Sequence, residues 1–169
     1  MKRTSFILVV TLIVFWAAVS VNFAFAKTLT VDNNDSSNFD TIQNAIDSAN
    51  DGDTVKVLSG VYKGVEIEDQ IKLVSAEGDK PLIDGSKGDS RRLVSIRIRS
   101  SNVTVDGFEI KGGGSIHNGI SIEAEEGARE GVTISNNEIH GITESYERPW
   151  AFGILAAWGG PEGGIVIED

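Results

Sequence analysis

The sequence contains no cysteine, and this absence excludes several kinds of chemistry. Nucleophilic thiols, thiolate metal sites and iron–sulfur clusters all require that residue. Histidine is nearly absent as well: only His117 and His140 occur, both expected in loops, and their spacing matches no metal-ligand motif. A copper or zinc site would need a further donor such as Glu138. The sequence therefore predicts no metal site, and a fold held by packing and backbone hydrogen bonds instead of disulfides.

Positive charge is also scarce. The chain has 15 Lys and Arg against 25 Asp and Glu, a formal net charge of −10, and no basic cluster. This balance excludes nucleic acid as a partner, because nothing would neutralise its phosphates. It also counts against direct electrostatic capture of an anionic polysaccharide unless a cation bridges the two. We interpret the excess of acid as a solvated surface.

Long apolar runs are confined to the N-terminus. Two basic residues precede an almost wholly apolar stretch at residues 6–19, and Ala24-Phe25-Ala26 places small residues at −3 and −1 before Lys27. The stretch is short for a membrane span of about 20 residues, so residues 1–26 are predicted to be a cleaved signal peptide. We expect an exported protein (secreted, periplasmic or on the cell surface) with no later membrane span.

Residues 27–169 would form the mature protein, which has 143 residues. Its formal charge would be −10 − 2 = −12, because the first 26 residues carry two basic side chains and no acidic one. This length suffices for one domain with its own core, and no linker or second domain is evident.

Three stretches of the chain can be aligned with one another: Val103–Ile110, Val132–Ile139 and Ile165–Asp169. Their starts lie 132 − 103 = 29 and 165 − 132 = 33 residues apart, a period typical of repeat architectures. Apolar and polar residues alternate inside each stretch, as in a strand with one buried face. The fifth position is a residue that adopts left-handed backbone cheaply, and so predicts a tight bend: Gly107, Asn136, Asp169.

Further strand-like pieces precede these repeats. A second column is predicted through Ile96, Ile120 and Ile154, while the lengths between them vary as loops do. The remaining pieces are residues 28–31, 54–58, 61–62, 65–67, 71–74, 82–83 and 93–98. The pattern predicts an all-β fold, a right-handed parallel β-helix solenoid. Residues 165–169 begin a repeat and stop at its bend, so we expect the domain, 27–169, to be truncated at its C-terminal end.

One segment has the period of an amphipathic helix. Between Phe39 and Ala49, apolar residues recur three or four apart. Asp40 with Gln43 predicts a capping box at the start and Gly52 the end, so the helix is expected at about residues 40–50. Its predicted role is to cap the open first coil of the stack.

The segment from Phe39 to Tyr62 resembles the opening of pectin-lyase-like right-handed β-helix proteins. A capping helix there leads through a Gly-Asp turn, here Gly52-Asp53, into a strand and a Gly-x-Tyr. The Val-Thr-Val-Asp-Gly-Phe run at 103–108 is similar to repeats of the same superfamily, and this chain is interpreted as an N-terminal fragment of such a protein. The resemblance implies the fold and leaves the activity open, because this fold hosts lyases, hydrolases, esterases and non-catalytic surface proteins. Similar repeats occur in a periplasmic copper-protein family associated with nitrous oxide reductase.

No catalytic group is assigned by the sequence. A polysaccharide lyase would need a base and cationic groups, and Lys111, Arg129 and Arg148 are candidates. A glycoside hydrolase would need paired carboxylates, and Asp106 and Glu168 share a column two strands apart, about 10 Å. The alternative is that all of these are solvated outward side chains.

Two Asx-rich segments have structural interpretations. Asn136 and Asn137 are expected to bond backbone groups at a bend, as stacked asparagines do. Asp32-Asn-Asn-Asp35 offers closely spaced oxygens, but it lacks the glycine and glutamate of an EF-hand loop. We therefore predict no cofactor, with calcium as a minor alternative.

The predicted ligand site is the aromatic insertion before Ile154. It brings together side chains that stack on sugar rings and pair with carboxyl groups: Tyr146, Arg148, Trp150 and Trp158. The alternative is that these aromatics only pack the loop onto the solenoid. We hypothesise an exported protein that binds or processes an extracellular polysaccharide or cell-envelope component. If it is an enzyme, it would be a polysaccharide lyase or glycoside hydrolase. The alternatives are a non-catalytic structural or adhesive cell-surface protein and a periplasmic copper-handling protein.

Overall fold

The computed structural model describes residues 25–35, 39–87, 94–113, 117–123, 130–143, 150–156 and 165–168. Except for its last two residues, the predicted signal peptide lies outside these ranges. Among the helices within them, none is both long enough and apolar enough to cross a membrane.

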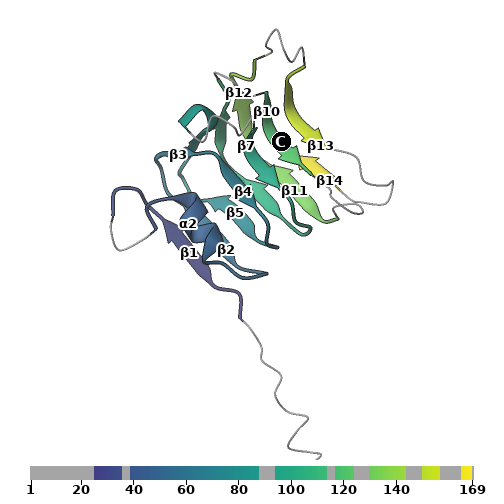
Figure 1. The fold of residues 1–169 in the computed structure, drawn as a ribbon. Coiled ribbons are helices and arrows are strands. Elements are labelled where there is room, and N and C mark those ends of the chain that lie inside the picture. The colour runs from purple at the N-terminus through teal and green to yellow at the C-terminus, as the bar shows by residue number, and fades with distance from the viewer. Residues whose placement is uncertain are drawn as a thin grey trace, which may run out of the picture.

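The described chain forms three parallel β-sheets, which Figure 1 shows as a stack running from purple to yellow. Sheet A contains β1 (Thr28–Val31), β2 (Thr54–Val57), β5 (Lys72–Ser75), β8 (Thr104–Asp106), β11 (Val132–Ser135) and β14 (Ile165–Glu168). Sheet B contains β3 (Val61–Lys63), β6 (Leu82–Asp84), β9 (Glu109–Lys111) and β12 (Glu138–His140). Sheet C contains β4 (Val65–Ile67), β7 (Val94–Ile98), β10 (Asn118–Ile122) and β13 (Phe152–Ala156). From β2 onward, successive strands belong to sheets A, B and C in rotation, so the predicted all-β class is confirmed.

The two predicted columns are confirmed by the strand register. In sheet A, Val105 pairs with Ile134, which pairs with Ile167. In sheet C, Ile120 lies between Ile96 and Ile154. Parallel neighbours cannot be joined by a tight turn, so the chain passes through the other two sheets before it adds the next strand to the same sheet. The length of these connections can vary without a change in the register of the strands.

The core lies on the inner faces of the sheets. Val55, Leu73 and Val105 are successive partners in sheet A, and each is fully buried. β-branched and other bulky apolar residues at alternate positions fill the space between sheets, because side chains of a strand point alternately to its two faces. Phe108, also fully buried, lies directly after the bend at Gly107.

The bend after sheet A has the predicted left-handed backbone. Gly107 has φ +86° and Asn136 has φ +54°. The N–H of Gly107 donates to the carbonyl of Ser135 in the next repeat, at 3.2 Å, so the two bends are neighbours. The positive φ favours glycine at position 107, and a Cβ there would also displace Ser75 Oγ.

Asn137 bonds the backbone of the preceding repeat, as predicted. Its Oδ1 accepts from the N–H of Phe108 at 2.9 Å, and its Nδ2 donates to the carbonyl of Val105 at 2.9 Å. No stacked asparagine lies below it, since Phe108 occupies that position. The side chain therefore ties the bend to two backbone groups of the preceding repeat.

The single described α-helix is shorter than predicted. Helix α2 spans Ile42–Asp47, whereas we expected about residues 40–50. Phe39 forms a parallel bridge with Val31, and its N–H donates to Thr30, which keeps it out of the helix. Helix α2 buries Ile42, Ala45 and Ile46 and packs against β1, β2 and β4. It lies beside β1 and β2 at the N-terminal end of the stack (Figure 1).

The predicted caps of this helix are wrong. Thr41, with extended backbone, is the N-cap, and its side chain accepts from the N–H of Asn44 at 3.2 Å. Gln43 makes no capping box, because its carboxamide contacts β4 instead. The helix ends at Ser48, and Gly52 (φ +89°) belongs to the turn before β2. A short 3₁₀ helix, η1 (Gly85–Lys87), follows β6.

Candidate functional site: an arginine–glutamate cluster on sheet C

The outer face of sheet C carries a row of charged side chains. Glu66 lies between the buried Val65 and Ile67, so it must point away from the core. The same alternation directs Arg97 outward from β7. The register places Glu66, Arg97 and Ser121 side by side across three strands.

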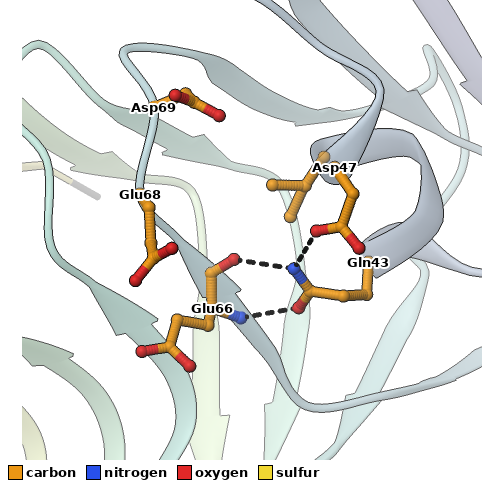
Figure 2. A pocket seen from close by; sticks show the side chains of 6 residues that line it. Gln43, Asp47, Glu66, Glu68 and Asp69 are labelled. Carbon is orange, nitrogen blue, oxygen red and sulfur yellow. Dashed lines mark hydrogen bonds between the residues drawn. The ribbon is translucent and has the colours of Figure 1, made fainter.

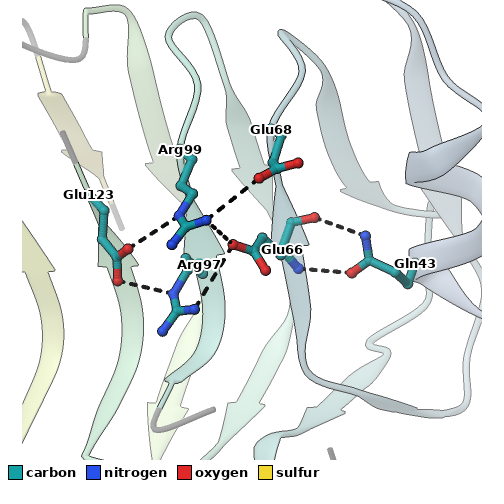
Figure 3. Close-up of polar contacts among 6 residues, drawn as sticks. All are labelled: Gln43, Glu66, Glu68, Arg97, Arg99 and Glu123. Atoms are coloured by element: carbon teal, nitrogen blue, oxygen red, sulfur yellow. Dashed lines mark hydrogen bonds and ion pairs between the residues drawn. The ribbon is translucent and has the colours of Figure 1, made fainter. Parts of the chain in front are cut away.

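Two arginines link three glutamates in this row (Figure 3). Arg97 Nε lies 3.0 Å from Glu123 Oε1, and its guanidinium lies 3.9 Å from Glu66 Oε1. Arg99 pairs with Glu66 at 2.9 Å, with Glu123 at 3.4 Å and with Glu68 at 3.6 Å. We call Glu66, Glu68, Arg97, Arg99 and Glu123 the arginine–glutamate cluster.

The cluster is partly removed from water. The side chains of Glu66, Arg97 and Glu123 are 17%, 24% and 29% exposed, whereas Glu68 at the rim is 68% exposed. Arginine has a rigid planar fork, so several ion pairs hold each guanidinium in one orientation. The result is a fixed set of hydrogen-bonding groups, in which the described residues supply three carboxylates and two guanidinium groups.

An open acidic pocket of about 280 Å³ adjoins the cluster, between α2 and the end of β4 (Figure 2). Asp47, Glu68 and Asp69 line it, together with Glu66 and Gln43. The Gln43 carboxamide bonds the N–H of Glu66 at 2.9 Å and its carbonyl at 3.1 Å, and also Asp47 at 2.8 Å. Gln43 therefore fastens the helix to β4. In the part of the chain that the structure describes, no three His, Cys, Asp or Glu residues are placed to hold a metal ion.

The predicted aromatic site is only partly described. Tyr146, Arg148 and Trp158 lie outside the described residues. Trp150 is 66% exposed and lies two residues before β13, the edge strand of sheet C. Trp150 therefore lies at the N-terminal side of β13, whereas the cluster lies at the C-terminal ends of β4, β7 and β10.

Lys111, a candidate base, lies on sheet B at the end of β9. Its Nζ is 3.8 Å from Asp84 Oδ2, and Asp84 is only 5% exposed. Burial acts to raise the pKa of Asp84, but hydrogen bonds from Ser86 and the nearby Lys111 and Lys87 outweigh it and hold that pKa below its ordinary value. Lys111 thus serves as the counter-ion of a buried carboxylate.

Asp106 and Glu168 share the predicted column, but the carboxylate of Asp106 is already hydrogen-bonded to its neighbours. Asp106 pairs with Ser135, which pairs with Glu168, so the two carboxylates lie two strands apart. Asp106 Oδ1 accepts from Ser135 Oγ and from Asn136 Nδ2, both at 2.7 Å. These bonds stabilise the bend. Arg129 lies outside the described residues.

The two histidines lie in different places. His140 ends β12, so the expectation of a loop is wrong for it, and its Nε2 lies 2.7 Å from Glu109 Oε1. His117 precedes β10, is 6% exposed, and its Nδ1 has no hydrogen-bond partner among the residues that the structure describes. Asp32, in the segment considered for calcium, accepts from the N–H of Asn34 at 2.9 Å in a local turn.

No family model, no curated protein and no solved structure matches this chain. The function is therefore argued from the site alone. Sequence reasoning missed the arginine–glutamate cluster, although a signal existed. The predicted column through Ile96 and Ile120 extends to Val65, and once that partner is known, Glu66 falls beside Arg97.

Proposed function

We propose that this chain is an exported, right-handed parallel β-helix protein of the pectin-lyase-like class, and that it binds an extracellular polysaccharide along the outer face of sheet C. The rotation of strands through three parallel sheets supports the solenoid. The leader-like first 26 residues support export. The resemblance at residues 39–62 supports the class.

The observation that carries the binding proposal is the half-buried arginine–glutamate cluster. Sugar hydroxyls bind best to planar donors and acceptors that are already fixed, since little entropy is then lost on binding. Neighbouring strands bring charged groups about 4.8 Å apart, close to the repeat of an extended glycan. Trp150 adds an exposed aromatic face on the same sheet, on which a sugar ring can stack.

The substrate class follows from charge. Among the described residues, carboxylates outnumber guanidinium groups in the cluster, and the adjoining pocket is acidic. A polyuronate would be repelled, so we propose a neutral polysaccharide. Binding is favoured over cleavage because Arg97 and Arg99 are engaged in ion pairs and Asp106 in the bend. A lyase or hydrolase would need groups beyond those that the structure describes.

A panel of neutral and acidic polysaccharides, tested by affinity electrophoresis and calorimetry, examines this proposal. Trp150→Ala should weaken binding of the neutral polymer about tenfold and leave stability unchanged, because an exposed ring is lost. Val61→Ala, which trims another exposed apolar side chain on sheet B, is the matched control and should bind normally. If the protein binds no polymer, or prefers polyuronates, the proposal is wrong.

A further inference from the structure

The backbone nitrogen of Lys27 is held by a buried carboxylate. It donates to Asp53 Oδ1 at 2.8 Å, and the N–H of Asn50 donates to Asp53 Oδ2 at 2.8 Å. Asp53 is only 3% exposed. The carbonyl of Lys27 in turn accepts from the N–H of Thr54 at 2.9 Å. Lys27 is therefore the first residue that the sheet fixes on both sides.

Two residues before Lys27 are described, and neither makes a comparable contact: Phe25 is 90% exposed, and Ala26 is exposed as well. Every helix and strand that the structure describes lies within residues 28–168. The first described strand thus begins directly after the position at which the Ala24-Phe25-Ala26 pattern predicts signal-peptidase cleavage.

We propose that cleavage after Ala26 turns the Lys27 nitrogen into an α-ammonium group that Asp53 binds, so that export processing completes the N-terminal end of the fold. This inference rests on the proposed export. It assigns Asp53 as the receptor of the new N-terminus.

The chemistry is peptide hydrolysis by a leader peptidase. One water molecule is consumed: the bond between the Ala26 carbonyl carbon and the Lys27 nitrogen breaks, the hydroxyl goes to Ala26, and a proton goes to the nitrogen. At neutral pH the released Ala26 carboxyl group gives its proton to the amine, leaving carboxylate and ammonium. Before cleavage, Asp53 accepts one neutral N–H from Lys27; afterwards, the same nitrogen carries a positive charge and three hydrogens.

The surroundings of Asp53 suit an ion pair. The half-exposed Lys27 side chain forms an ion pair with Asp53, its Nζ 3.6 Å from Asp53 Oδ2, and it also bonds the Ser48 carbonyl at 3.2 Å. An α-ammonium group on the same residue would bind the other carboxylate oxygen, Oδ1, which the Lys27 nitrogen already contacts. Hydrogen bonds from the N–H groups of Lys27 and Asn50 hold the pKa of Asp53 below its ordinary value. The carboxylate is thus charged and available to an ammonium group at hydrogen-bond distance.

The first test compares two chains of equal charge. Removal of an N-terminal fusion by a protease that leaves no extra residue yields one chain beginning at Lys27 and another beginning at Ala26. The Lys27 chain should have an unfolding equilibrium constant at least about tenfold smaller, because only there does the ammonium reach Asp53. Asp53→Asn should abolish the difference. Equal stability of the two chains, or a difference that persists in Asp53→Asn, overturns the proposal.

A second measurement uses only the unmutated protein, so it does not require Asp53→Asn to fold. The α-amine of the Lys27 chain should be acylated at least about tenfold more slowly in the native state than in denaturant, as read by mass spectrometry. Equal rates overturn the proposal. A full-length chain expressed in an exporting bacterium shows separately whether Lys27 becomes the N-terminus. Another N-terminus there would contradict the proposed export and leave glycan binding as an independent question.

Discussion

Charged side chains cover the outer faces of sheets B and C, but their arrangement differs. On sheet C, each arginine contacts two or three carboxylates in a half-buried cluster. On sheet B, the ion pairs are separate: Lys80 with Glu138, and Lys111 with Asp84. The first pair of sheet B is more than half exposed on both sides.

We interpret the linked charges of sheet C as a preformed binding surface and the separate pairs of sheet B as ordinary surface charge. Exposed pairs contribute little, because water screens them and the side chains lose entropy when they pair. Linked, partly buried charges hold one another in place, and removal of one leaves the others uncompensated. Sheet C therefore presents linked, half-buried groups to a ligand, whereas the Lys80–Glu138 pair of sheet B is largely solvated.

The largest expected effect is that of Arg97→Met. Glu66 and Glu123 would lose a cation in a half-buried position, so the free energy of unfolding should fall by about 2 kcal/mol. Urea unfolding at neutral pH measures this loss, and binding of the neutral polysaccharide should weaken in the same variant. Arg97→Lys keeps the charge but loses the planar guanidinium fork. Its free energy of unfolding should therefore lie between those of the unchanged protein and of Arg97→Met. Unchanged stability in Arg97→Met would show that the cluster is no more than surface charge.

A smaller effect is expected from Asp84, the buried carboxylate of sheet B. Its pKa is lowered in the folded protein, so its contribution to stability is present above its ordinary value of 3.8 and is lost as pH falls through the lower folded value. Asp84→Asn should lower the free energy of unfolding by about 1 kcal/mol at neutral pH. The variant should also lose stability less steeply as pH falls below 3.8, the ordinary pKa of the carboxyl group. Unfolding followed as a function of pH measures both changes. An acid limb identical in the two proteins would contradict the assignment.

Much of the fold could be predicted because its signals are local. Alternation of apolar residues identified the strands, and the residue type at Gly107 and Asn136 identified the bend, since few residues adopt positive φ. The expected helix limits were wrong because Thr41, and not Asp40, is the N-cap, and because Ser48 caps the C-terminus before Gly52 is reached. Spacing alone does not tell which of two neighbouring polar residues caps a helix.

The site was harder to predict because it depends on register between distant strands. Val65 and Ile96 are partners although 96 − 65 = 31 residues separate them, and the connecting loops differ in length from repeat to repeat. A shift of one residue would point Arg97 into the core. Gln43 was assigned to a cap because its spacing fits one, whereas its partners lie on β4. The aromatic insertion remains a prediction for Tyr146, Arg148 and Trp158.

The smallest expected effect is that of Lys80→Ala, which sharpens the comparison from the other side. The hydrogen bond to Glu138 raises the pKa of Lys80 and lowers that of Glu138, so the pair forms, but both side chains are more than half exposed. Solvent screening should leave the midpoint of urea unfolding unchanged within error, at low and at high salt. Glu138→Gln is the matched partner and should behave alike. A clear loss of stability at low salt that disappears at high salt would mean that the charges of sheet B also act together, and that fixation by linked ion pairs is no special property of sheet C.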